Sequence, residues 1–161
     1  MTLRLRDYDL HWLEEPIFPP EDFAAIARLR DGTGVPMAAG ENACTSFQFR
    51  EMFAAEAVDY AQPSVTKVGG VTEFLKVATL ADAAGVTLMP HSPYFGPGFL
   101  ATLQLQAARG TAGGMIERYH MDLEASLYGG LVTPVNGGFV VPTGPGLGRD
   151  PDPDVMKTYA A

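Results

Sequence analysis

The segment Trp12-Leu13-Glu14-Glu15-Pro16 indicates the fold of this chain, because a short apolar run ends in an acidic residue and a proline follows at once. Similar runs that end in a polar residue return at about the spacing of one strand and one helix: Met37-Ala38-Ala39-Gly40-Glu41-Asn42, Leu88-Met89-Pro90-His91-Ser92 and Met115-Ile116-Glu117-Arg118. In a barrel of parallel strands, side chains from the strand ends meet around one cavity. We therefore expect three carboxylates and one imidazole to lie together, as a metal site with an acid-base partner.

The segments between these runs are typical of helices. Helices are predicted over 21–29, 46–55, 72–84 and 99–108, with Ser46 as a cap and glycines 32, 34 and 85 as terminators. Strands are predicted over 10–13, 35–39, 58–62, 86–89 and 115–116. This alternation favours parallel strands with outer helices, so the predicted fold class is α/β. Five strand ends without a sixth indicate only the back part of a TIM-type barrel, because a closed barrel usually needs about 250 residues.

We expect a single partial barrel domain over residues 1–161, with strand-helix units at 9–120 and a tail at 121–161. Within the tail, 131–142 is predicted to form two extended segments around Asn136-Gly137-Gly138, a hairpin-type turn. The stretch 144–154 is rich in Gly, Pro and Asp and is predicted to be an irregular loop that lies on another part of the chain.

Composition excludes several classes of function. The chain has 161 residues, a hydrophobic content of 47% and a net charge of −8, with no basic stripe to bind nucleic acid or an anionic membrane surface. The single cysteine, Cys44, excludes an internal disulfide framework and fits a cytoplasmic location. We find no signal peptide and no run that approaches the ~20 apolar residues needed to span a bilayer.

Glu14 and Glu41 are candidate ligands of a hard divalent ion such as Mg²⁺, which prefers oxygen donors. The alternative is that they are ordinary acids near helix N-termini. His91 lies in the rigid, aromatic loop 90–98, which suits a wall over a small polar substrate. A stiff strand-helix connection is the alternative reading of this loop, and a satisfied core or rim residue is the alternative for His91. Glu117 could bond a substrate, act as a general acid, or pair with Arg118.

Gly69-Gly70 follows the third predicted strand and precedes a helix. Such a pair could cradle a phosphate, or it could allow the strand and the helix to pack closely. The chain contains neither GxxxxGK[ST] nor GxGxxG, which disfavours nucleotide binding.

Together these residues resemble the enolase superfamily, in its mandelate racemase/muconate lactonizing enzyme branch. The matching segments follow the family's order over nearly the whole chain: Trp12 to Pro16, Ala39 to Asn42, Asp59 to Gly70, Met89 to Ser92 and Ile116 to Arg118. The resemblance implies a TIM-type barrel of which this chain holds about strands four to eight. It also implies abstraction of the proton α to a carboxylate, with Mg²⁺ bearing the charge of the resulting enediolate.

The same resemblance implies a role for each strand-end residue. Glu14 and Glu41 match the metal ligands of the fourth and fifth strands. His91 matches the seventh-strand histidine that acts as base or acid, and Glu117 matches the eighth-strand glutamate that hydrogen-bonds the enediolate. Ser64 departs from the pattern, because the family has a catalytic aspartate or lysine there. This departure favours an acid-sugar dehydratase or cycloisomerase over a racemase or epimerase, which remains the alternative.

The implied substrate is a small carboxylate-bearing molecule, and Ser64, Tyr94 and Asn42 are candidates for binding it. The family's capping domain, its first three strands and their lysine pair and aspartate ligand have no counterpart here. We therefore expect a fragment or truncated gene product that is inactive in isolation. The competing hypothesis is a non-catalytic half-barrel that assembles with a front-half chain or with copies of itself.

Overall fold

The core of the computed structural model, which describes residues 2–110 and 113–160, is a four-stranded parallel sheet. Its strands are β1 (Leu13–Glu14), β2 (Met37–Ala39), β3 (Tyr60–Ala61) and β4 (Thr87–Leu88), side by side in chain order. The register pairs Leu13 with Met37, Ala38 with Tyr60, and Tyr60 with Thr87. The predicted α/β class with parallel strands is confirmed.

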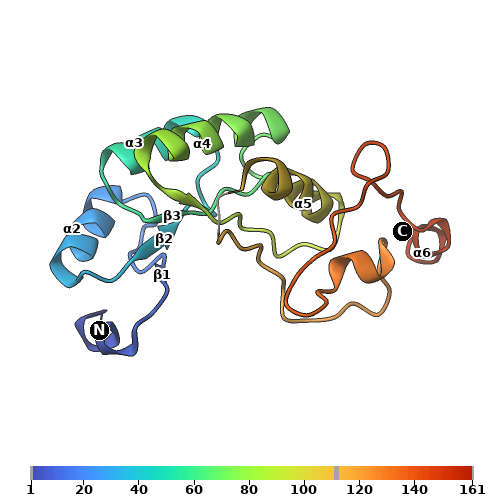
Figure 1. Ribbon diagram of the computed structural model, residues 1–161, viewed down its shortest axis with the longest axis horizontal. Helices are drawn as coiled ribbons and strands as arrows, with labels where there is room; N and C mark the ends of the chain where they lie inside the picture. The colour runs from blue at the N-terminus through green and yellow to red at the C-terminus, as the bar shows by residue number, and fades with distance from the viewer. Residues whose placement is uncertain (1, 111–112, 161) are drawn as a thin grey trace.

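Helices alternate with these strands, as predicted. They are α2 (Phe23–Thr33), α3 (Ser46–Ala54), α4 (Val71–Ala84) and α5 (Pro97–Arg109), and Figure 1 shows α3 and α4 side by side over one face of the sheet. Short helical segments are α1 (Thr2–Leu5), η1 (Arg6–Tyr8), η2 (Gly129–Val132) and α6 (Pro153–Thr158). Within residues 2–110 and 113–160, none of the helices combines the length and apolarity needed to cross a bilayer.

The helix ends follow local chemistry with one difference from prediction. Asp22 caps α2 by accepting a hydrogen bond from the Ala25 N–H at 2.9 Å. The cap of α3 is Thr45, not Ser46, because Thr45 is extended and accepts from the Gln48 N–H, whereas Ser46 donates to Glu73 on α4. Gly34 and Gly85 end α2 and α4 in the left-handed conformation.

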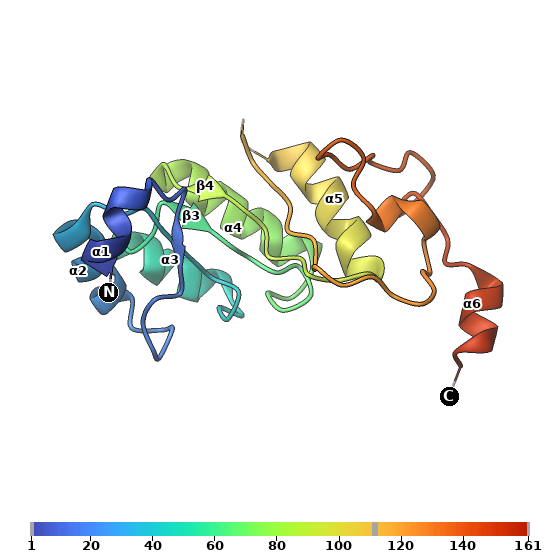
Figure 2. The ribbon, with the colours of Figure 1, turned by 90° about the horizontal axis from the view of Figure 1, so that it is seen from below.

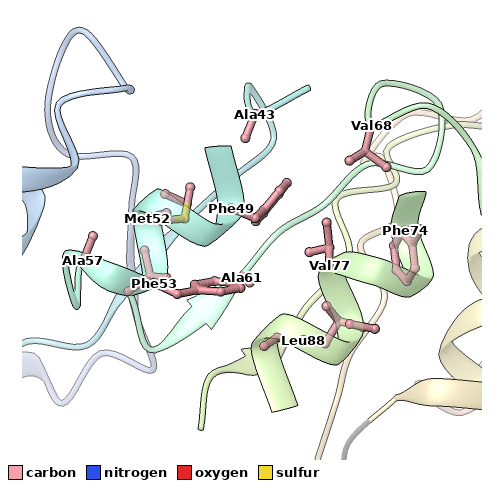
Figure 3. Packing of buried hydrophobic residues seen from close by; sticks show 14 of the residues in the cluster. Ala43, Phe49, Met52, Phe53, Ala57, Ala61, Val68, Phe74, Val77 and Leu88 are labelled. Atoms are coloured by element: carbon pink, nitrogen blue, oxygen red, sulfur yellow. The ribbon is translucent and has the colours of Figure 1, made fainter. Parts of the chain in front are cut away.

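The hydrophobic core lies between the sheet and the helices α3 and α4. Phe49 and Met52 on α3 and Phe74 and Val77 on α4 are almost fully buried and lie near Ala61 and Leu88 of the sheet, as Figure 3 shows. Gly40 lies between β2 and Glu41 at a φ of 131°, and a Cβ there would come 2.7 Å from Cε1 of Phe49. Glycine at this position therefore lets the chain turn toward Glu41 while it touches the core.

The fifth strand predicted at 115–116 is wrong. No strand is assigned within 113–120, and the Met115 N–H is 3.2 Å from the sulfur of Met89, where a strand would use a backbone carbonyl. An apolar pair can form a strand only when a neighbour offers a ladder of backbone partners, and β4 does not extend far enough to do so.

The tail packs on α5. Tyr128 and Val132 form a second buried cluster with Phe99, Leu100 and Leu103. The predicted hairpin turn exists as an antiparallel bridge between Val135 and Gly138, but the segment before it enters through the helical turn η2 and is not extended from residue 131. Figure 2 shows α6 projecting from the end of the molecule opposite the N-terminus.

Candidate active site

The chemistry-bearing side chains come from the carboxyl ends of the strands. Glu14 is the last residue of β1, Glu41 follows β2, and His91 follows β4. One ligand atom from each of these three residues lies within 4.8 Å of the other two. This arrangement arises because parallel neighbours end at the same edge of a sheet, so that residues far apart in sequence share one rim.

Two of the three possible ligands in this group suit a hard cation, and the third does not. The carboxylate oxygens of Glu14 and Glu41 are the ligands that Mg²⁺ prefers, whereas an imidazole nitrogen suits softer metals. Mg²⁺ commonly takes one or two protein carboxylates and fills its other positions with water or substrate oxygens. Glu14 and Glu41 therefore fit a Mg²⁺ site, and His91 fits a neighbouring acid-base group.

His91 is buried between two carboxylates. Its Nδ1 lies 2.9 Å from Oε2 of Glu117 and 3.1 Å from Oε2 of Glu41. Both contacts are close electrostatic pairings, and among the described residues Nδ1 has no partner in good hydrogen-bond geometry. Burial lowers the pKa of His91, but the carboxylates of Glu117 and Glu41 outweigh burial and raise the pKa above its usual value.

Glu117 faces His91 rather than Arg118. The contact with His91 holds the pKa of Glu117 below its usual value, against the effect of burial. The backbone carbonyl of Glu117 accepts a hydrogen bond of 3.1 Å from the Ser92 hydroxyl, which ties Glu117 to the loop that follows β4. Arg118 forms its ion pair with Asp122 and not with Glu117. The alternative of a Glu117–Arg118 pair is therefore wrong.

Ser64 lies beneath Tyr94. Its Oγ is 2.7 Å from the Tyr94 hydroxyl and 2.9 Å from the hydroxyl of Thr66, and Ser64 is fully buried. The edge of the Tyr94 ring meets His91, with ring centroids 6.1 Å apart and planes at 87°. Ser64 therefore bonds Tyr94, the aromatic neighbour of His91, through an uncharged hydroxyl.

Asn42 lies exposed at the rim. Its Nδ2 donates to Glu15 at 2.7 Å and reaches Oε1 of Glu41 at 3.4 Å. Of the other candidates, Gly69 and Gly70 are at φ of 104° and 93°, and a Cβ on Gly69 would come 3.2 Å from Cγ of Glu73. A carboxylate at the start of α4 and this close approach both favour the packing role of the glycine pair over a phosphate cradle.

Two residues that the sequence analysis did not single out contact the site. The Trp12 Nε1 and the Gln62 Nε2 both donate to Oε2 of Glu14, at 3.2 and 2.8 Å. With Glu14 and Glu117 they line a cavity of about 220 Å³, whose apolar walls are Met89, Pro90, Met115 and Ile116. Alternate residues of a strand face the same side, and this period could have indicated both residues. Trp12 precedes Glu14 by two residues, and Gln62 precedes Ser64 by two.

Comparison with known proteins agrees with this arrangement. A family model described as "Enolase C-terminal domain-like" matches residues 1–155. The chain is 32% identical to D-galactarolactone cycloisomerase of Agrobacterium fabrum, covering 97% of the chain and 43% of that protein. It is also 32% identical to D-xylonate dehydratase of Haloferax volcanii, covering 99% of the chain and 39% of that protein.

Solved structures show the same likeness. A 3,6-anhydro-D-galactonate cycloisomerase from Zobellia galactanivorans matches 98% of the chain and 45% of its own, with a TM-score of 0.82 and 31% identity. An L-talarate dehydratase from Polaromonas, complexed with Mg and L-glucarate, matches 97% of the chain and 42% of its own, with a TM-score of 0.79 and 29% identity. The chain thus spans less than half the length of these relatives. By its fold, its strand-end residues and these matches, the chain belongs to the enolase superfamily, as the C-terminal portion of a mandelate racemase/muconate lactonizing enzyme-type protein.

Proposed function

We propose that the protein containing this chain is a Mg²⁺-dependent dehydratase or cycloisomerase that acts on an acid sugar. The observation that carries the proposal is the meeting of His91 with Glu41 and Glu117, at 3.1 and 2.9 Å, beside Glu14. A base next to carboxylates that can hold a cation suits removal of a proton α to a substrate carboxylate. The dehydratase and cycloisomerase activities of the relatives support the same reaction class.

In this proposal Glu14 and Glu41 hold Mg²⁺, together with ligands from outside the chain. The bound ion supplies positive charge that stabilises the substrate carboxylate as it gains electron density. The Asn42 amide, which contacts both Glu15 and Glu41, helps to fix the direction of the Glu41 side chain. Ordered partners of this kind keep a ligand in its binding rotamer.

The proton is moved by His91. Because Nδ1 faces Glu41 and Glu117, proton exchange with the substrate takes place at Nε2. In a dehydration, the C–H bond α to the carboxylate and the C–O bond of the next carbon break, and the leaving hydroxyl takes up a proton to become water. His91 serves one of these two transfers, and the burial of its ring beside the Tyr94 ring limits access of bulk water to it.

A test compares two histidine variants of the natural polypeptide against a library of aldonic, aldaric and anhydro-sugar acids with Mg²⁺ present. His91→Ala should lose at least about 100-fold in kcat, as expected for a general acid or base. His120→Ala is the matched control, because His120 is exposed and contacts Tyr119 rather than the strand-end group. Turnover by His91→Ala at the wild-type rate would refute the role given to His91.

The second candidate is a non-catalytic half-barrel that requires a partner segment. One observation favours it: within the described residues, β1 and β4 are both edge strands with a single neighbour. The two candidates differ in cation binding. Calorimetric titration of Mg²⁺ into the natural polypeptide should show saturable binding if it is the enzyme, and no saturable heat if it is a non-catalytic remnant.

A further inference from the structure

We propose that Gln62 is a positioning residue that orients Glu14 for cation binding, an inference that rests on the proposed function. Gln62 follows β3 directly and is buried, whereas Glu14 is exposed at the strand end. Gln62 is 5% exposed, and its backbone N–H donates to the Ala39 carbonyl at 2.9 Å, which holds the residue in the sheet beyond β3. Its side chain reaches across the sheet to Glu14, a residue 48 positions earlier in the chain.

The chemistry of the two groups determines which way the amide faces. An ionised carboxylate only accepts hydrogen bonds, so the amide NH₂, and not the amide oxygen, must face Glu14. The Nε2–Oε2 distance of 2.8 Å is that of a charge-assisted hydrogen bond. The amide oxygen is consequently directed elsewhere, and Oε1 is buried without a partner among the described residues. A buried acceptor without a partner is unfavourable, and its presence here indicates that the amide is oriented for Glu14.

The donors around Glu14 select one of its two oxygens. Within residues 2–110 and 113–160, both hydrogen bonds to this side chain end on Oε2, one from Gln62 and one from the Trp12 indole at 3.2 Å. Oε1 of Glu14 is therefore the oxygen left for a cation, and Glu14 offers one carboxylate oxygen to the group that it forms with Glu41 and His91. Glu14 is an exposed strand-end residue, and without these donors its side chain would sample several rotamers, at a cost to binding.

Residues that hold a ligand in this way commonly change metal affinity by about 10- to 100-fold when they are removed. The buried Gln62 makes the shorter of the two bonds, so it should contribute more than the half-buried Trp12.

The test is calorimetric titration of Mg²⁺ into the natural polypeptide and two matched variants. Gln62→Met keeps the length of the side chain and removes the amide, and it should weaken Mg²⁺ binding by about 10- to 100-fold. Gln104→Met is the control, because Gln104 lies on α5 and donates to the Pro142 carbonyl of the tail, not to Glu14. It makes the same chemical change away from Glu14, and Mg²⁺ affinity should stay at the wild-type value. Thermal unfolding without Mg²⁺ establishes that each variant is folded.

The outcomes separate this inference from the proposed function. Absence of Mg²⁺ binding by the wild-type protein overturns the proposed function and the inference with it. Wild-type binding together with unchanged affinity in Gln62→Met overturns the inference alone. If Gln62→Met does not fold, Trp12→Phe removes the second donor to the same oxygen and should weaken binding severalfold; unchanged affinity there refutes positioning through Oε2.

Discussion

Gly98 packs against Thr66, and this contact predicts that alanine at position 98 destabilises the protein. Helix propensity alone predicts the opposite, a gain in stability. Gly98 is near the start of α5, where alanine in place of glycine stabilises a helix by up to about 1 kcal/mol. In the folded chain, however, a Cβ at Gly98 would lie 2.4 Å from Cγ2 of Thr66. Thr66 cannot simply rotate away, because its Oγ1 is 2.9 Å from the buried hydroxyl of Ser64. Gly98→Ala must therefore move α5 or break the hydroxyl cluster under Tyr94.

The expected magnitude follows from these terms. Insertion of a methyl group into a filled contact costs about 1–3 kcal/mol, and the propensity gain offsets up to about 1 kcal/mol of that. We expect Gly98→Ala to lower the free energy of unfolding by about 1–2 kcal/mol. Thr66→Ser keeps the hydroxyl and removes Cγ2, so it should cost about 0.5 kcal/mol alone and should also relieve the clash. The double variant should lie within about 0.5 kcal/mol of wild type, because its alanine then adds only helix propensity.

Urea unfolding of the four proteins measures this double-mutant cycle, and the expected coupling between the two sites equals the relieved clash, about 1–3 kcal/mol. Gly32→Ala in α2 is the matched control, since a Cβ there meets nothing within 4 Å and should only stabilise the helix. If the double variant is as unstable as the sum of the single variants, the packing of Thr66 on Gly98 is not the reason for the glycine.

Three further outcomes are expected. Asp59 receives hydrogen bonds from Arg30 at 2.9 and 2.7 Å and from the Met37 N–H; burial raises the pKa of Asp59, but these bonds outweigh it and hold the pKa below its usual value. Asp59→Asn should therefore lower the free energy of unfolding by about 1–3 kcal/mol at pH 7. This difference from wild type should be present above about pH 4 and should disappear as the pH falls through the lowered pKa of Asp59. Urea unfolding at a series of pH values tests this expectation. Phe49→Ala, at a fully buried site, should lower the free energy of unfolding by about 3–5 kcal/mol, and a loss below about 1 kcal/mol would contradict the packing of α3 on the sheet. Ser64→Ala and Tyr94→Phe break the same 2.7 Å hydrogen bond, so their effects on kcat in the natural polypeptide should not add. Fully additive effects would show that the two residues act independently of this bond.

Much of the local structure could be predicted from the sequence. Helices α2 to α5 follow apolar periodicity and glycine stops, and the strand ends follow short apolar runs that stop at Glu14 or at Pro90-His91. Two details could not be predicted in this way. Thr45 and Ser46 are equally good caps in sequence, and the contact of Ser46 with Glu73 on another helix separates them. The pair Met115-Ile116 looks like a strand, but strand formation depends on a neighbour that the local pattern does not contain.

The sequence by itself therefore determined the order of strands and helices and the residues that stand at the strand ends, because those features depend on propensity and period over a few positions. Only the tertiary structure decided which of these residues touch. Gln62 bonds Glu14 across 48 positions, Ser64 bonds Tyr94 across 30, and His91 lies between Glu41 and Glu117. Such contacts arise when parallel strands bring distant segments to one edge, and no pattern within a single segment specifies the distance or the direction of the hydrogen bonds formed there.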